Sequence, residues 1–163
     1  MNQLELTTKD RPVVAAACNK AEASGQPAMA LELPDGRIIT GKTSPLLGAS
    51  AALMLNALKA LGDIRDEMHL ISPIIIEPIQ KLKVEHMGNH NPRLHSDEIL
   101  IALSICAATN PTAALALEQL PKLRDCEAHS SVILSRVDEH VYHKLGVNLT
   151  CEPQYQTKKL YHT

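Results

Sequence analysis

The stretch Gly36–Thr43, GRIITGKT, decides how the first half of the chain folds. Its letters match the phosphate-loop pattern G-x-x-x-x-G-K-[ST], in which a loop between a strand and a helix cradles a phosphate. The residues before it, AMALEL (28–33) and the turn Pro34-Asp35-Gly36, instead predict a β-hairpin whose returning strand is RIIT (37–40). Four strand residues span roughly 13 Å, which is too far for Gly36 and Lys42 to hold one phosphate. We therefore predict a hairpin and not an ATP-binding loop.

Composition narrows the class of protein. The chain has 163 residues, 45% of them hydrophobic and 21% charged, which is typical of a single globular domain over 1–163. The net charge of −2 and the lack of a basic stripe argue against nucleic-acid binding. The four cysteines form no C-x-x-C pair, and no leader or apolar run of about 18 residues is visible. We therefore expect a cytoplasmic protein without a membrane span or disulfides.

Helices and strands are expected to alternate around the hairpin. Apolar periodicity and capping residues predict helices at 11–24, 45–61, 73–87, 97–109, 111–120 and 136–145, and strands at 28–33, 37–40, 68–71, 130–134 and 147–151. This order predicts an α/β fold. We expect a three-layer α/β/α sandwich with a mixed sheet of about five strands and extra helices.

Part of the opening stretch is a candidate anion site. Lys42, Thr43 and Ser44 lie just before the expected helix at 45–61, and Ser72 precedes the next one. Free N–H groups at a helix start attract anions, so two neighbouring starts would hold a small anionic metabolite. The alternative is that both serines are ordinary N-caps, since serine is among the commonest capping residues.

A second candidate site is the loop NPRLHSDE (91–98). An arginine beside a histidine, Arg93 and His95, is suited to binding and protonating an anionic substrate. The alternative is a capped loop in which Asp97 and Glu98 stabilise the positive end of the next helix.

Metal and nucleophile chemistry have no clear signature. His86, His90 and His95 are irregularly spaced around a loop, with no cysteine nearby in the sequence. No serine lies in a G-x-S-x-G motif. We expect no metal site and no cofactor.

Two segments are apolar on nearly all sides: LLGASAALMLNALKAL (46–61) and ILIALSICAATNPTAALALEQL (99–120). A helix that is apolar all round is buried all round. Either both lie beneath neighbouring helices of one compact fold, or part of their surface meets another subunit or domain.

Three long stretches resemble a family of uncharacterised bacterial proteins, the domain-of-unknown-function family 1846. They are residues 32–61, 91–124 and 146–162, and the likeness runs through nearly the whole chain. The resemblance implies that the chain corresponds to about the last third of a longer protein, whose N-terminal domain is absent here. The family offers no activity or catalytic residue to carry over.

The element order also resembles the cytidine-deaminase-like sandwich. Deaminases of that layout place zinc ligands at two helix starts, as H-x-E and P-C-x-x-C. Residues 41–61 contain no His, Cys or Glu, and three isoleucines follow Pro73, which argues against zinc deamination. We expect a domain that acts in oligomer or interdomain assembly and contributes to a small anionic ligand site. The alternative is part of an enzyme that acts on a phosphorylated or carboxylated metabolite.

Overall fold

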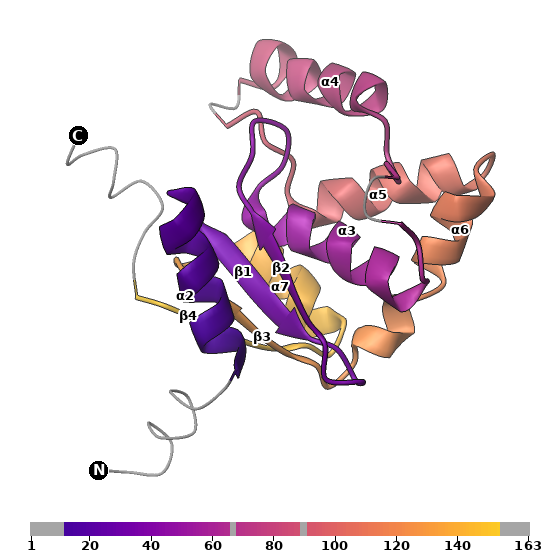
Figure 1. Cartoon of the computed structure of the whole chain (residues 1–163). Coiled ribbons are helices and arrows are strands. Elements are labelled where there is room, and N and C mark those ends of the chain that lie inside the picture. Colours follow the sequence, from indigo (N-terminus) through magenta and orange to yellow (C-terminus); the bar gives the residue numbers. More distant parts are fainter. Residues whose placement is uncertain (1–11, 66–67, 89–90, 154–163) are drawn as a thin grey trace, which may run out of the picture.

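A computed structural model describes residues 12–65, 68–88 and 91–153 as a mixed α/β fold (Figure 1). The elements, in chain order, are α2 (Pro12–Ser24), β1 (Ala28–Glu32), β2 (Ile38–Lys42), α3 (Ala49–Leu61), α4 (Pro73–Lys81), the π-helix η1 (Leu82–His86), α5 (Ser96–Ala107), α6 (Pro111–Leu117), the 3-10 helix η2 (Leu120–Leu123), β3 (Glu127–Ser130), α7 (Arg136–Lys144) and β4 (Asn148–Cys151). The four strands form one sheet in the order β2-β1-β3-β4.

The predicted hairpin is confirmed. Strands β1 and β2 pair antiparallel, with Leu31 opposite Ile39. Gly36 supplies the turn with φ of 92°, a conformation that suits glycine. Residues 37–40 therefore lie in the turn and the ladder, and they form no loop around a phosphate.

Gly41, the second glycine of the opening stretch, lies where β2 crosses α3. A Cβ atom at this position would come within 2.3 Å of the backbone nitrogen of Leu53 and 2.6 Å of its Cα. Only a residue without a side chain lets the strand and helix backbones approach this closely. The second glycine of the phosphate-loop pattern is thus required by packing.

The rest of the sheet differs slightly from the prediction. Strand β3 pairs antiparallel with β1 and parallel with β4. The strand expected at 68–71 is wrong: Leu70 and Ile71 are buried, but these residues form bends without strand pairing. The strand expected at 130–134 lies earlier in the chain, as β3 at Glu127–Ser130. It ends at Ser130, whose hydroxyl donates to the carbonyl of Val132 and accepts from its N–H. The described sheet therefore has four strands where about five were expected.

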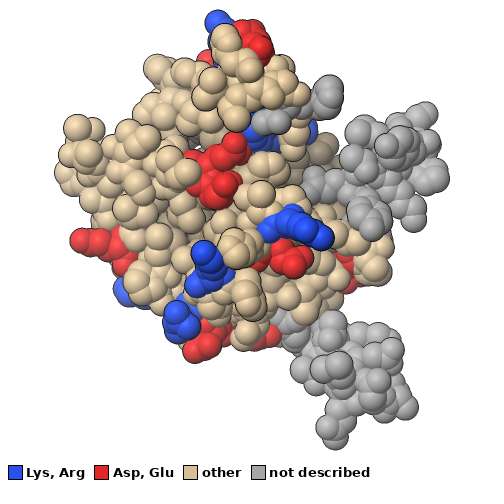
Figure 2. All heavy atoms as spheres, turned by 180° about the vertical axis from the view of Figure 1, so that it is seen from behind, with Lys and Arg blue, Asp and Glu red and all other residues tan. Residues whose placement is uncertain are grey.

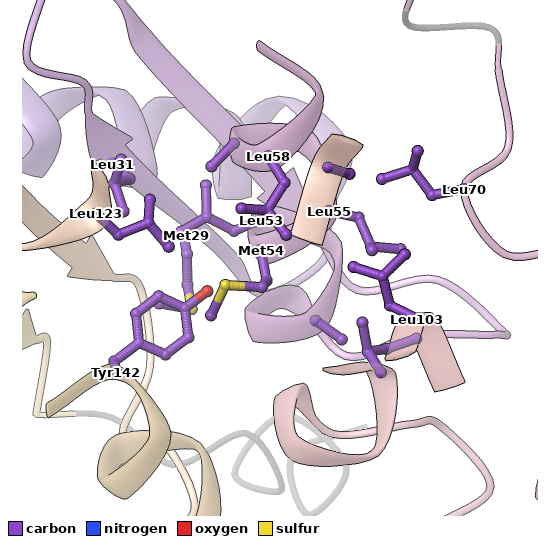
Figure 3. Close-up of a cluster of buried hydrophobic side chains, with 14 of the residues drawn as sticks. Met29, Leu31, Leu53, Met54, Leu55, Leu58, Leu70, Leu103, Leu123 and Tyr142 are labelled. Atoms are coloured by element: carbon purple, nitrogen blue, oxygen red, sulfur yellow. The ribbon is translucent and has the colours of Figure 1, made fainter. Parts of the chain in front are cut away.

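Helices cover both faces of the sheet, as Figure 1 shows. On one face α2 packs against β1 through a small cluster of Val13, Ala17 and Ala30. The large core lies on the other face, beneath α3, α5, α6 and α7. Figure 3 shows part of it: Met29, Leu31, Leu53, Met54, Leu58 and Tyr142 are among its members. Within the described ranges no helix is long and apolar enough to cross a lipid bilayer.

The helix expected to open at Ser44-Pro45 begins later, at Ala49, with Gly48 as its N-cap. The reason is local pairing. Leu47 forms an isolated parallel bridge with Leu94, and the Ser44 hydroxyl accepts from the N–H groups of Leu46 and Leu47. These bonds hold residues 44–48 outside the helix.

Substitution of the two glycines should separate their roles. We expect Gly41→Ala to lower the free energy of unfolding by about 3 kcal/mol or more, because the added Cβ forces β2 and α3 apart. A Cβ added at Gly36 meets no atom within 4 Å. Gly36→Ala should therefore lower the free energy of unfolding only by the strain of its positive φ, about 1–2 kcal/mol. Urea unfolding measures both values. Equal losses would contradict the packing role of Gly41.

Candidate functional site

Three helix starts meet at one small pocket. The N-caps are Gly48 of α3, His95 of α5 and Ser135 of α7. The lining residues are Gly48, Ala49, Ser50, Asn91, Arg93, Leu94, His95, Leu134, Ser135 and Asp138. Helix starts carry unpaired N–H groups and partial positive charge, so their convergence favours a negative group in the pocket.

Backbone pairing holds two of these starts side by side. The N–H of Leu94 donates to the carbonyl of Leu46 at 3.1 Å, and the N–H of Gly48 donates to the carbonyl of Leu94 at 3.2 Å. The segment before α3 is therefore fixed against the segment before α5. This pairing brings Ser50 and His95, 45 positions apart in the sequence, to one pocket.

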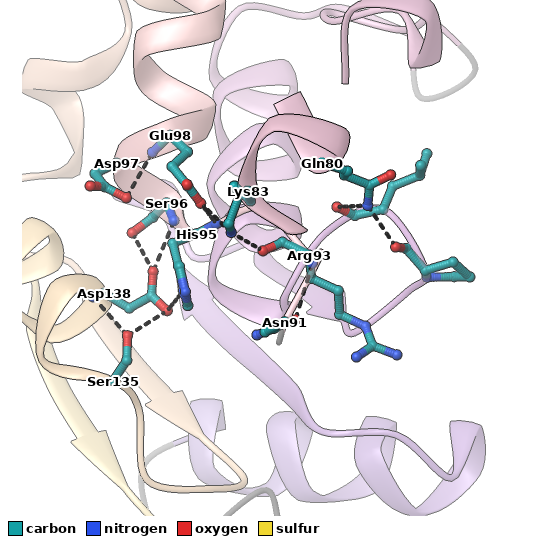
Figure 4. A network of polar contacts seen from close by, with 12 residues as sticks. Gln80, Lys83, Asn91, Arg93, His95, Ser96, Asp97, Glu98, Ser135 and Asp138 are labelled. Atoms are coloured by element: carbon teal, nitrogen blue, oxygen red, sulfur yellow. Dashed lines mark hydrogen bonds and ion pairs between the residues drawn. The ribbon is translucent and has the colours of Figure 1, made fainter. Parts of the chain in front are cut away.

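Asp138 is the negative group already present. It lies in the first turn of α7 and is only 4% exposed. One carboxylate oxygen accepts from the Ser96 N–H at 2.8 Å and from the Ser96 hydroxyl at 2.7 Å. The other lies 3.1 Å from the Ser135 hydroxyl and 3.2 Å from Nδ1 of His95 (Figure 4). The carboxylate thus joins the starts of α5 and α7.

These contacts shift two pKa values in opposite directions. Burial on its own raises the pKa of Asp138, but hydrogen bonds from His95 and from the backbone and hydroxyl of Ser96 outweigh it and lower the pKa to about 2. The hydrogen bond to Asp138 raises the pKa of His95, against an opposing effect of burial. The pair therefore favours a carboxylate beside an imidazolium.

His95 is the more exposed member of the pair. Its side chain is 31% exposed, whereas that of Asp138 is 6% exposed. Because Nδ1 faces Asp138, Nε2 is left as the nitrogen that can exchange a proton with a bound molecule. A carboxylate that orients an imidazole in this way is a common arrangement in general acid–base catalysis.

A buried tyrosine holds one of the residues that line the pocket. Tyr142 is fully buried, and its hydroxyl donates to the carbonyl of Ser50 at 2.6 Å. Burial, followed by the charge of Asp138, raises the pKa of this phenol well above its usual value, so it stays a neutral donor. Ser50 is therefore fixed at the start of α3.

The predicted loop residues Arg93, His95, Asp97 and Glu98 have different roles. Arg93 donates through Nε to the carbonyl of Ser44 at 2.6 Å, and Figure 4 shows its side chain pointing away from His95. Glu98 accepts from the His95 N–H at 2.8 Å and from Nζ of Lys83 at 2.9 Å. Asp97 accepts from the Glu98 N–H. His95 thus faces the pocket with its side chain, while both acidic residues form hydrogen bonds at the helix start.

The residues proposed for anion binding are spread out. Lys42 ends β2 with an exposed side chain, and Thr43 is buried. Ser44 lies near the end of α4 that carries Gln80, whose amide donates to the carbonyls of Pro45 and Leu46. Ser72 caps the other end of α4 by accepting from the Ile74 N–H. Eight helical residues separate those ends by about 12 Å.

Ser135 and Asp138 have the spacing of a capping box before the helix at 136–145, but this local pattern does not reveal the role of Asp138 in the pocket. The hydroxyl of Ser135 does accept from the Asp138 N–H, as a capping residue should. The contact that matters joins Asp138 to Ser96 across 42 positions, and no local pattern encodes it. Ser50 was missed for the same reason.

Comparisons with known proteins place the chain among uncharacterised bacterial relatives. Residues 9–161 match the family model described as domain of unknown function DUF1846, C-terminal. The chain is 55% identical over 161 residues to a UPF0371 protein of Streptococcus pyogenes serotype M5, and 56% identical over 161 residues to one of Corynebacterium urealyticum. Each match covers 99% of this chain but only 33% and 32% of the relative. The chain thus spans about a third of the length of these relatives.

Asp138→Asn tests the pair through pH. The raised pKa of His95 stabilises the fold fully below pH 6.5, and this contribution is lost as pH rises through the folded value. The lowered pKa of Asp138 stabilises the fold fully above pH 3.8, and this contribution is lost as pH falls through about 2. Wild type should therefore exceed Asp138→Asn most between about pH 4 and 6.5, by about 2 kcal/mol or more.

Urea unfolding across pH and an NMR titration of His95 measure these effects. The His95 midpoint should fall in Asp138→Asn and stay in place in the control Asp97→Asn. A His95 midpoint that is unchanged in Asp138→Asn would refute the pairing.

Proposed function

The chain belongs to the DUF1846 family as its C-terminal domain, and from this membership we propose that it is a cytoplasmic assembly domain that docks onto the rest of a longer protein. The observation that carries the proposal is a pair of exposed apolar surfaces on α4–η1 and on α5. The proposed occupant is the part of the family protein outside the third of its length that this chain matches. A second copy of the chain is the competing occupant.

The first surface is the outer side of α4 and η1. Its apolar side chains are Ile74, Ile75, Leu82, Val84 and Met87, exposed by 79%, 40%, 49%, 43% and 65%. Of the residues in α4, only Ile76 is buried. In Figure 1 this helix lies at the margin of the fold, away from the sheet. An apolar helix this exposed is typical of a surface that meets a partner.

The second surface is the outer face of α5. Ile101 and Ile105 are 61% and 69% exposed, and their spacing of four places them on one side of the helix. Helices α5 and α6 lie on the right in Figure 1 and therefore on the left in Figure 2, where few charged side chains are seen. Interface centres are depleted of charged residues, which fits a docking role for this side.

The two apolar segments of the sequence therefore have different explanations. Helix α3 is apolar because it is internal: nine of its residues are buried, including Leu53, Met54 and Leu58. Helix α5 buries Ile99, Ala102, Leu103 and Cys106 inside the fold and still exposes two isoleucines. The relatives are about three times as long as the matched region, and we infer that the rest of their length covers these isoleucines.

Amide hydrogen exchange tests the docking proposal. It compares the 163-residue chain with the full-length Streptococcus pyogenes relative. We expect slower exchange over the segment equivalent to 73–87 in the longer protein, because docking covers α4 and η1. The segment equivalent to α2 serves as the internal control and should exchange alike in both. Equal exchange at 73–87 would refute docking there, and a dimer of the chain in light scattering would favour a second copy.

A matched pair of variants refines the test. Ile101→Gln should change the stability of the chain by no more than about 0.5 kcal/mol, because the side chain is exposed. Ile99→Gln, on the inner face of the same helix, should cost about 2–5 kcal/mol. In the longer relative, the variant equivalent to Ile101→Gln should increase exchange at the docked segment.

A second candidate function is supported by the His95–Asp138 pair. In this alternative the domain contributes an acid–base residue to an enzyme that acts on a phosphorylated or carboxylated metabolite. Nε2 of His95 would give or take the proton, and Asp138 would hold the ring. Because Asp138 already occupies the helix starts, the protonated His95 is the group that favours an anionic substrate.

Thermal shift with inorganic phosphate separates the two proposed anion sites. A ligand at 100 times its Kd stabilises by about 2.7 kcal/mol, a readily measured shift. If the pocket binds the anion, His95→Gln abolishes the shift and Lys42→Ala retains it. If Lys42, Thr43, Ser44 and Ser72 hold the anion, Lys42→Ala abolishes the shift and His95→Gln retains it. No shift with phosphate, sugar phosphates or nucleotides would count against both sites.

A further inference from the structure

Three potential metal ligands converge on the face of the sheet opposite the His95 pocket. They are Cys18 on α2, His129 on β3 and Glu152 directly after β4. One ligand atom from each lies within 4.8 Å of the others. His129 is 1% exposed, while Cys18 and Glu152 are partly buried. The three residues lie on separate elements, so no local turn explains their convergence.

Sheet register accounts for this arrangement. His129 is opposite Ala30 on β1 and Thr150 on β4. Ala30 packs against α2, so His129 lies on the face that α2 covers. The Glu152 N–H donates to the carbonyl of Ser130 at 2.9 Å, which extends the alignment of this segment with β3. Cys18 completes the group from the helix above.

The hydrogen bonds of His129 orient its ring for a ligand role. Nδ1 lies 2.6 Å from the Thr150 hydroxyl, and Nε2 lies 2.7 Å from a carboxylate oxygen of Glu152. Metal-bound histidines usually bond their second nitrogen to a neighbouring acceptor, which fixes the tautomer. Thr150 provides that partner here, and Nε2 faces the Glu152 carboxylate. A metal ion would replace the proton shared by His129 and Glu152.

We propose that Cys18, His129 and Glu152 form a zinc site that fastens α2 to the sheet. One sulfur, one nitrogen and one oxygen are ligands that Zn²⁺ accepts, and tetrahedral bond lengths place such ligand atoms about 3.3–3.7 Å apart. Small side-chain rotations bring the present group to that spacing. A thiolate and a carboxylate balance the charge of the ion, so the partly buried site is neutral overall. A fourth position is left for water or a group from another part of the protein.

The position of the site explains what the ion would do. The apolar cluster beneath α2 consists of Val13, Ala17 and Ala30, with Ala16 and Ile38 at its margin, all of them small or partly exposed except Val13. Among the described residues, this cluster offers few methyl groups to hold α2 on the sheet. A metal ion held by Cys18, His129 and Glu152 would add a strong link from α2 to β3 and to the end of β4.

Cobalt substitution tests the site on the 163-residue chain. Co²⁺ bound to a thiolate gives a near-ultraviolet charge-transfer band, and tetrahedral Co²⁺ gives intense visible bands. We expect both with the wild-type chain, saturating at one ion per chain and abolished by Zn²⁺. Cys18→Ser should lose the charge-transfer band. Cys151→Ser should retain it, because Cys151 lies on the other side of β4, in a groove with α7.

Two further variants keep the test decisive if one protein folds poorly. Glu152→Gln, at a partly exposed position, should weaken Co²⁺ binding at least tenfold, and Thr150→Val should weaken it by about 10–100-fold. Zn²⁺ should raise the melting temperature of the wild type and leave that of Cys18→Ser unchanged. Absence of the charge-transfer band in the wild-type chain, or its persistence in Cys18→Ser, would overturn the proposal.

Discussion

The contact between Gly41 and the backbone of Leu53 is the constraint on which the arrangement of this fold depends. It allows β2 to lie directly against α3, with no side chain between the strand and the helix. Asn56 reinforces the contact by donating to the carbonyl of Thr40 at 2.9 Å. Since α3 also packs against α5 and supplies Ser50 to the pocket, the close approach sets the position of the candidate site.

The polar counterpart of this contact is the Asp138 carboxylate. Its partners include the hydroxyls of Ser96 and Ser135, the Ser96 N–H and Nδ1 of His95, at the starts of α5 and α7. A buried carboxylate without these donors would be costly, so its low pKa and the geometry of the pocket have the same cause. The structure therefore provides an oriented histidine through bonds that also stabilise the fold. A variant that breaks these bonds should therefore alter both the stability of the fold and the orientation of His95.

Local chemistry predicted much of the fold, and long-range contacts account for what it missed. The turn at Gly36 and the caps at Ser72 and Ser135 follow from neighbouring residues, and they were predictable. The delayed start of α3 depends on the bridge from Leu47 to Leu94, 47 positions away. His95 was singled out by its residue type and loop, but its partner Asp138 was not, because helix α7 returns to α5 only in the tertiary structure. Cys18, His129 and Glu152 were likewise invisible as a group, since sheet register brings them together.

The proposed docking surface and the pocket are physically connected through Lys83. This residue of η1 is 4% exposed, and its ammonium donates to the carbonyl of Arg93 at 2.7 Å and to Glu98 at 2.9 Å. The same Glu98 oxygen accepts the N–H of His95. Because removing one partner of a buried ion pair is costly, η1 and the loop that carries His95 are expected to move together. A partner domain that docks on α4 and η1 would therefore act on the His95 loop through one buried lysine. The two proposed functions, assembly and acid–base chemistry, are therefore compatible in one domain, and docking would control the geometry of the His95 loop.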